Sequence, residues 1–334
     1  MRVVALDRAG RRAIEDALRR GEPVDLHLSE PPPPEVRLDD IVPLCHGVQV
    51  WSPALTLSLQ GLLPPRAKPG ADLSVSVVIP TNRHWPIGLQ AFCGQDVAVD
   101  ILVLDNGEQP IQPEFSAPNI RVERVPWQGH GPTRQAAVDM MDSEYVLFTV
   151  DDAMPMGAGF VRTMVQSLED GEFDAVFARQ VPWPLASEIV ARRLREWTPP
   201  GRSAVEVDRL DHVCALYRRQ TLLDDPLPDV PIAEDLHWGR RHRVGYVPMA
   251  PVLHSHERRP MPLFRRTRDI HVEHLVLGDR PAVPTLFSVV RALPGIVRPT
   301  LSGGPVEFAN QIAELVGQWA AIRQYRKRQL TRLP

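Results

Sequence analysis

The sequence lacks the features that mark secreted, membrane-spanning and nucleic-acid-binding proteins. Its three cysteines, Cys45, Cys93 and Cys214, lie far apart and form no CxxC or disulfide pattern, which favours a reducing cytoplasm. No uninterrupted apolar run is long enough to span a bilayer, and the charged N-terminus does not resemble a signal peptide. The net charge of -3 argues against general nucleic-acid binding, which usually needs a basic excess.

Glycine-rich phosphate-binding loops are also absent. Neither a GxGxxG nor a GxxxxGK[ST] sequence occurs, so a dinucleotide-binding fold and a P-loop are not supported. The 35 prolines favour many short loops over long coiled coils. With 334 residues and 43% hydrophobic content, the chain can nevertheless bury a sizeable core.

The most informative stretch that is present is EYVLFTVDDAMP, from Glu144 to Pro155. Tyr145 to Val150 is an apolar run of the kind that forms a strand buried on both faces of a parallel sheet. The run ends on Asp151 and Asp152, and ligands of open α/β sheets bind beyond the carboxyl ends of the strands. The two carboxylates therefore either hold a divalent cation or simply end the strand as turn residues.

Two earlier strands end in the same way. Val75 to Ile79 is followed by polar residues at Thr81 and Asn82, and Val99 to Leu104 is followed by Asp105. Strands that alternate with helical segments and short loops predict right-handed βαβ units and a mostly parallel sheet. The three polar clusters should then converge at one edge of the sheet, as a nucleotide site requires.

The chain is expected to have three parts. Residues 1–70 form an N-terminal accessory region, with an independent binding module as the alternative. Within this region a helix is predicted at Arg11–Arg20 and a strand at Leu55–Leu59. Residues 71–280 form the main domain, and residues 281–334 form a C-terminal helical extension.

Several motifs together resemble a known family. They are VSVVIPTN, ILVLDNGE, GHGPTRQAAVDMMDSEYVLFTVDDAMP, FARQVP, IAEDLHWGRR and GYVPMAPVLHSH. Their order and spacing, from Leu73 to Leu277, resemble inverting family-two glycosyltransferases with the GT-A fold, in the bacterial rhamnosyltransferase branch that serves polysaccharide biosynthesis. The resemblance implies a mostly parallel central sheet flanked by helices. It also implies transfer of a sugar from a nucleotide-diphosphate donor, such as dTDP-rhamnose, to a hydroxyl group.

The resemblance assigns roles to residues by their position in these motifs. Pro80, Thr81 and Asn82 would line the base and ribose pocket, and Asp105 would accept a hydrogen bond from the base. The full set of implied nucleotide-binding residues is Pro80, Thr81, Asn82, Asp105, Arg134 and Asp151.

The implied metal site would hold Mg²⁺ or Mn²⁺ through Asp152 and through His254 or His256. Both histidines lie on the same face of a strand, because they are two residues apart. Imidazole and carboxylate ligands both suit Mn²⁺. Val150 replaces the first of three acids that the family often has, so a degenerate site with weak metal affinity is an alternative. A structural, hydrogen-bonded role is the alternative for the histidines.

The acceptor hydroxyl needs a general base, and the adjacent pair Glu234 and Asp235 supplies the candidates. The resemblance makes Asp235 the base, whereas Glu234 either positions it or contacts acceptor hydroxyls. Alternatively, both acids only favour the N-terminus of a helix. Trp183 and Trp238 either stack on acceptor sugars or belong to the core.

The acceptor itself is expected to be a glycan, a lipid-linked molecule or a small molecule. The C-terminal segment ends in RQYRKRQLTRLP, which either lies peripherally on an anionic membrane surface or merely follows helices that cover the main domain. Two further functions compete with glycosyl transfer. One is a nucleotidyltransferase, although TNRHWPIG lacks the glycine density expected after its first strand. The other is a non-catalytic sugar-nucleotide or glycan-binding protein.

Overall fold

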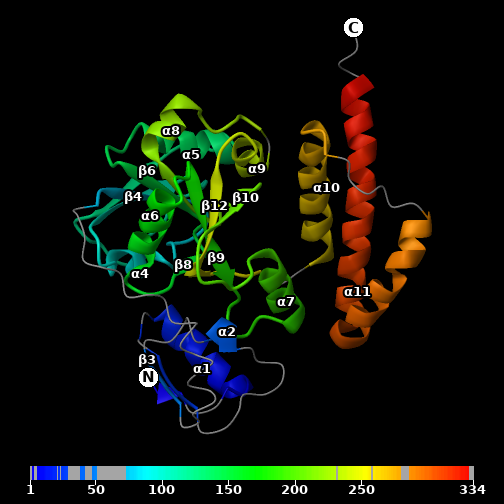
Figure 1. Cartoon of the computed structure of the whole chain (residues 1–334), viewed down its shortest axis with the longest axis horizontal. Coiled ribbons are helices and arrows are strands. Elements are labelled where there is room, and N and C mark those ends of the chain that lie inside the picture. Colours follow the sequence, from blue (N-terminus) through cyan, green and yellow to red (C-terminus); the bar gives the residue numbers. More distant parts are fainter. Residues whose placement is uncertain are drawn as a thin grey trace. The chain divides into compact units, whose positions relative to one another are not determined.

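The computed structural model describes residues 2–3, 6–20, 22, 24–28, 38–41, 47–50, 73–230, 232–256, 259–279 and 286–330. It divides into two compact units (Figure 1). The first comprises residues 1–230 and 234–255, and the second comprises residues 231–233 and 256–334. The strand predicted at Leu55–Leu59 lies outside the described residues.

A nine-stranded sheet forms the centre of the first unit, with the order β10-β12-β9-β11-β7-β4-β5-β6, and β8 pairs with β12. β4, β5, β6, β7, β9 and β12 run in one direction, whereas β8, β10 and β11 run in the opposite direction. The bounds are β4 (Val75–Thr81), β5 (Val99–Asp105), β6 (Ile120–Arg124), β7 (Tyr145–Thr149), β8 (Met154–Pro155), β9 (Ala175–Val181), β10 (Val205–Val207), β11 (Cys214–Arg218) and β12 (Val244–Leu253).

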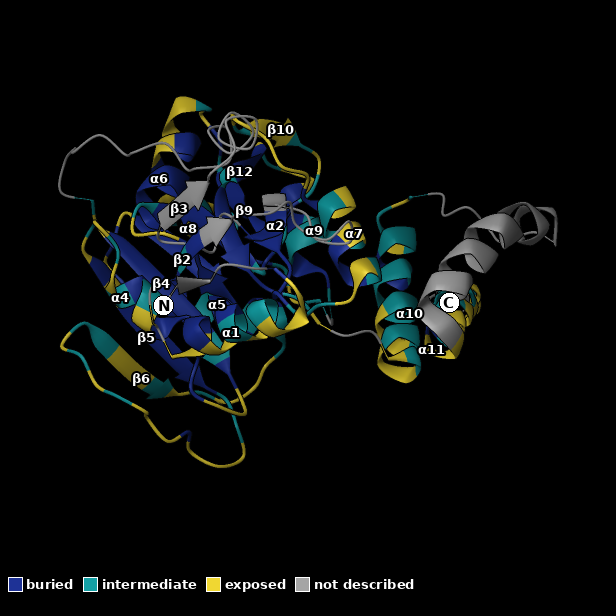
Figure 2. Cartoon of the chain, turned by 90° about the horizontal axis from the view of Figure 1, so that it is seen from below, coloured by how far each residue is buried: buried dark blue, intermediate teal, exposed yellow. Residues whose placement is uncertain are grey.

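Burial explains why the apolar runs occupy the middle of this sheet. Every residue of β7 is buried, as expected for a strand covered on both faces, whereas β6 at the edge is largely exposed (Figure 2). The parallel register pairs Thr81 with Asp105, so these two strands end side by side. The predicted α/β class is therefore confirmed, and the antiparallel strand β11 between β7 and β9 is an element that the sequence reading missed.

Helices cover both faces of the sheet. α4 (Leu89–Cys93) and α6 (Phe160–Asp170) contribute to one hydrophobic core, and α5 (His130–Val138), α8 (Arg219–Asp224) and α9 (Glu234–Gly239) contribute to the other. A Cβ on Gly131 of α5 would lie 2.4 Å from the carbonyl oxygen of Pro228. Glycine at this position thus lets α5 approach the loop that leads to α9.

The N-terminal region of the first unit adds a small parallel sheet in the order β1-β2-β3. Its elements are β1 (Arg2–Val3), α1 (Arg8–Arg19), β2 (Asp25–Leu28), α2 (Leu38–Ile41) and β3 (Gly47–Val50). Ile14 and Leu18 of α1 belong to the same hydrophobic cluster as Val181, Trp183 and Leu253 of the main domain. This region therefore packs as a layer on the main domain. α7 (Glu188–Trp197), capped by Ser187, follows β9.

The second unit is built from α10 (Pro260–Val276) and α11 (Leu286–Leu330), which pack against each other. The sequence predicts a C-terminal extension that begins at residue 281. The second unit of the structure already includes the residues from His256 onward, because α10 packs on α11. None of the described helices contains a stretch long and apolar enough to cross a membrane.

Candidate active site

The ends of β4 and β7 meet through a direct contact. The hydroxyl of Thr81 lies 2.8 Å from Oδ2 of Asp151 and 2.9 Å from the carbonyl oxygen of His84. Thr81 is buried, Pro80 is half-buried, and Asn82 is exposed. The structure thus brings together two of the polar clusters that the sequence placed at one sheet edge.

Asp105, at the end of β5, is buried and bonded to its own loop. Its two carboxylate oxygens accept hydrogen bonds from the backbone N–H groups of Gly107 and Ile111, each at 3.1 Å. Nη1 of Arg124 lies 3.7 Å from the same carboxylate. In this arrangement Asp105 shapes the loop after β5.

That loop borders a cavity of about 350 Å³ that the sequence reading did not predict. An exposed tryptophan, Trp127, stands at its rim, and no sequence periodicity could have singled it out. The lining residues are Asn106, Gly107, Glu108, Arg124, Val125, Pro126 and Trp127.

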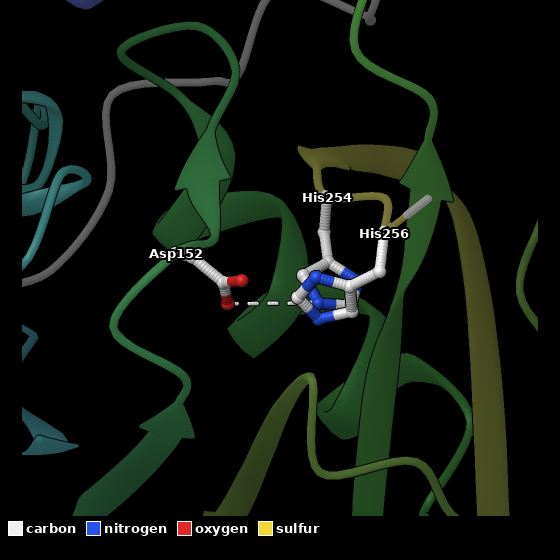
Figure 3. Close-up of side chains that lie close together, drawn as sticks. All are labelled: Asp152, His254 and His256. Atoms are coloured by element: carbon white, nitrogen blue, oxygen red, sulfur yellow. Dashed lines mark ion pairs between the residues drawn. The ribbon is translucent and has the colours of Figure 1, made fainter. Parts of the chain in front are cut away.

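Asp152 and His254 come together as the sequence predicted. Nε2 of His254, at the end of β12, lies 3.6 Å from Oδ1 of Asp152, in the loop after β7 (Figure 3). One ligand atom from each of Asp152, His254 and His256 lies within 4.8 Å of the others. The site therefore has one carboxylate and two imidazoles that could bind a divalent cation.

A chain of hydrogen bonds orients the ring of His254. Oδ2 of Asp211 accepts from Nε2 of Gln180 at 2.6 Å, so the amide oxygen of Gln180 faces Nδ1 of His254 at 2.9 Å. Nδ1 must then carry the proton and donate it, which leaves Nε2 as the nitrogen with a lone pair on the side of Asp152. This tautomer fits a metal ligand. Gln180 and Asp211 were not identified from the sequence.

Glu234, the first residue of α9, is the centre of a buried polar network. Its Oε1 accepts from Nη1 of Arg134 at 3.2 Å and from Nδ1 of His212 at 2.9 Å. The second ring nitrogen of His212, Nε2, is hydrogen-bonded to the hydroxyl of Tyr217. Glu234 is 4% exposed and, through Arg134, links α9 to α5.

The pKa of Glu234 reflects this network. Burial alone would raise the pKa of the carboxyl group, but the hydrogen bond and charge of His212, with the charge of Arg134, outweigh it and lower the pKa to about 2. The neighbouring Tyr217 hydroxyl has its pKa raised well above the ordinary value, chiefly by burial.

Asp235 has the opposite electrostatic environment. Burial, together with the negative charges of Glu234 and Asp211, raises its pKa against the opposing influence of His212. Its carboxylate accepts from the backbone N–H groups of His212 at 3.1 Å and Leu236 at 2.8 Å. The preceding Ala233 has a φ of 64°, a left-handed conformation that turns the chain into α9.

Both tryptophans predicted near the acceptor belong to hydrophobic clusters. Trp238 is fully buried, donates from Nε1 to the carbonyl oxygen of Asp225 at 2.8 Å, and stacks on His242. Trp238 therefore fits the alternative in which it belongs to the hydrophobic core. Trp183 is 9% exposed and lines a cavity of about 360 Å³, with the guanidinium of Arg19 4.5 Å from its ring centre.

No family model matches the chain, but it is similar in sequence to one known sugar transferase. The chain is 26% identical over 231 residues to the O-antigen chain rhamnosyltransferase RfbN of Salmonella typhimurium. The aligned region covers 60% of this chain and 73% of that protein.

Two solved structures are similar in backbone. The mannosyltransferase PcManGT from Pyrobaculum calidifontis, in complex with GDP-Man and Mn²⁺, has a TM-score of 0.47 and 15% identity, with 97% of this chain and 88% of that chain covered. TarS 1-349 of S. aureus, in complex with UDP-GlcNAc, has a TM-score of 0.44 and 14% identity, with 76% of this chain and 92% of that chain covered. The sequence relative agrees with the glycosyltransferase resemblance that the motifs predicted.

Proposed function

We propose that the chain is an inverting glycosyltransferase that moves a sugar, rhamnose, from a nucleotide-diphosphate donor to a hydroxyl group of a glycan or lipid-linked acceptor. The sugar is proposed because the curated relative is named a rhamnosyltransferase, and dTDP-rhamnose is the donor that the sequence resemblance implies. The reaction needs a base for the acceptor hydroxyl and stabilisation of the leaving diphosphate.

One observation carries this proposal: Asp211 contacts the residue that orients a candidate metal ligand, and the adjacent His212 contacts the candidate general base. Asp211 holds Gln180, which orients His254 beside Asp152. His212 donates its backbone N–H to Asp235 and its ring N–H to Glu234. A rigid connection of this kind supports a single reaction centre, because catalytic groups must be held within fractions of an ångström of their working geometry.

Asp152 and His254, with His256, are proposed to hold a divalent cation, Mg²⁺ or Mn²⁺. The tautomer of His254 and the carboxylate of Asp152 fit this role, since both present a lone pair on the same side. A bound cation would neutralise charge on the leaving diphosphate. Asp151, fixed by Thr81, would face the ribose.

Asp235 is proposed to take the proton of the acceptor hydroxyl as that oxygen attacks the anomeric carbon. Its raised pKa brings it closer to the operating pH than an ordinary aspartate, which suits a general base. Glu234 stays ionised beside it and fixes the position of α9. Attack from the face opposite the diphosphate would invert the anomeric configuration.

The nucleotide is proposed to bind along the ends of β4 and β5. Arg134 is proposed to face the nucleotide, as the resemblance implies, and its Nε has no hydrogen-bond partner within the described part of the chain. The cavity beside the loop after β5, with Trp127 at its rim, is a candidate for the base. Trp183 remains the candidate contact for the acceptor.

The direct test is a panel of nucleotide sugars incubated with purified protein and Mn²⁺. The true donor should raise the melting temperature, since a ligand that binds only the folded state stabilises it. It should also release nucleoside diphosphate, and EDTA should abolish that release. Formation of nucleoside triphosphate and sugar 1-phosphate when pyrophosphate is added to the nucleotide sugar would instead identify a nucleotidyltransferase. Binding of a nucleotide sugar without release of nucleoside diphosphate would identify a non-catalytic sugar-nucleotide-binding protein.

A further inference from the structure

Helix α11 of the second unit exposes a row of large apolar side chains. Phe308, Ile312, Val316 and Trp319 are each 41–47% exposed. With about 100° of rotation per residue, these four positions fall within a sector of roughly 80°. We call Phe308, Ile312, Val316 and Trp319 the apolar stripe.

The opposite side of α11 is the side that packs. Its buried residues are polar or small, namely Glu307, Asn310, Gly317 and Ala321. A Cβ on Gly317 would lie 2.9 Å from the carbonyl oxygen of Phe264 in α10, so this side meets the neighbouring helix. The usual amphipathic pattern is thus inverted, and packing on α10 does not use the apolar stripe.

Positive charge continues the apolar stripe toward the C-terminus. The guanidinium of Arg323 lies 3.9 Å from the ring centre of Trp319, and Arg326 and Lys327 are exposed. Residues 315–334 contain five Lys and Arg and no acid. Tryptophan beside basic side chains is suited to the boundary between lipid headgroups and acyl chains.

We infer that the apolar stripe and its basic continuation lie on an anionic membrane surface. The aromatic and aliphatic side chains would enter the headgroup region, and Arg323, Arg326 and Lys327 would contact acidic headgroups. A second copy of the chain fits less well. The apolar stripe is shorter than the three to four heptads of a coiled coil, and the residues that follow it carry like charges. This inference is independent of the proposed function.

The test is co-sedimentation of the full chain with vesicles of phosphatidylcholine alone and with added phosphatidylglycerol. Binding should require the anionic lipid. Replacing Phe308 and Trp319 together by serine should weaken it by about tenfold to a hundredfold, as expected for apolar side chains that leave the headgroup region. Arg326→Glu with Lys327→Glu should weaken it by at least about fivefold per charge.

Val306→Ser is the matched control, because Val306 is 61% exposed but lies outside the apolar stripe. This variant should bind like the wild type, and all variants should keep the wild-type circular dichroism and melting temperature. The inference is overturned if the full chain does not bind anionic vesicles, or binds neutral vesicles equally well. It is also overturned if light scattering shows a dimer that the double serine variant dissociates while vesicle binding is unchanged.

Discussion

Two pairs of adjacent acids, Asp151–Asp152 and Glu234–Asp235, look alike in the sequence but differ in the structure. The first pair is half-buried at the end of a strand, where it meets Thr81 and His254. The second pair opens a helix inside a polar network, and its two pKa values move in opposite directions. The difference shows that the environment, and not the residue type, sets the contacts and the pKa of each carboxyl group.

The largest effect should come from Asp235→Asn. The amide cannot accept a proton near neutral pH, so kcat should fall by about 10²–10⁴ while the donor KM changes little. Steady-state kinetics would measure both. Asp229→Asn is the matched control, since Asp229 is an exposed acid in the loop that leads to α9. A kcat within twofold to threefold of wild type (about 0.5 kcal/mol) would remove Asp235 from the mechanism.

The next effect concerns stability. Glu234→Gln should lower the free energy of unfolding by about 3–5 kcal/mol, because Arg134 and His212 lose the partner of a buried ion pair. Asp152→Asn should stay within about 0.5 kcal/mol, since that carboxylate is half-exposed, but it should abolish metal-dependent donor binding. Urea unfolding measures the two differences. Equal losses would mean that the two acid pairs do not differ as described.

A smaller effect is expected from Gln180→Leu. Leucine removes the amide oxygen that accepts from Nδ1 of His254, and loss of such a support typically weakens metal affinity by about 10–100-fold. Titration of Mn²⁺ followed by electron paramagnetic resonance gives the affinity directly, without turnover. Gln180→Glu keeps an acceptor oxygen toward His254 and should restore part of the affinity. Unchanged Mn²⁺ binding in the leucine variant would show that Gln180 has no such role.

The stability of the protein should also depend on pH. The pKa of Glu234 is lowered in the folded state from 4.5 to about 2, so its contribution is fully present above pH 4.5 and is lost as the pH falls toward 2. The Glu234→Gln variant should show a flatter stability profile in that range. Thermal unfolding across the acid range measures it, and parallel profiles would contradict the lowered pKa.

The rate should also fall as the pH is lowered, through Asp235, whose pKa is shifted in the direction opposite to that of Glu234. Because burial raises its pKa, the acid limb of the kcat profile should lie above the pH at which an ordinary aspartate titrates. A pH–rate profile at saturating donor measures the limb. An acid limb at the ordinary aspartate pKa would contradict the raised value.

The sequence by itself determined the α/β class and the strand ends, because buried strands consist of apolar runs and polar residues follow where these strands end. Tyr145–Thr149 and the acids after it were readable in this way. The motifs also placed Asp152 with His254, as the structure then found. The assigned roles of Asp235 and of the nucleotide-binding residues remain predictions.

Only the tertiary structure decided which partners these residues have. The contact between Arg134 and Glu234 joins positions 100 residues apart, and that between Gln180 and His254 joins positions 74 apart. Such contacts leave no local periodicity, so Gln180, Asp211 and His212 carried no signal. The burial of Trp238 and the exposure of Trp319 likewise depend on what packs against each side chain, which composition and spacing do not encode.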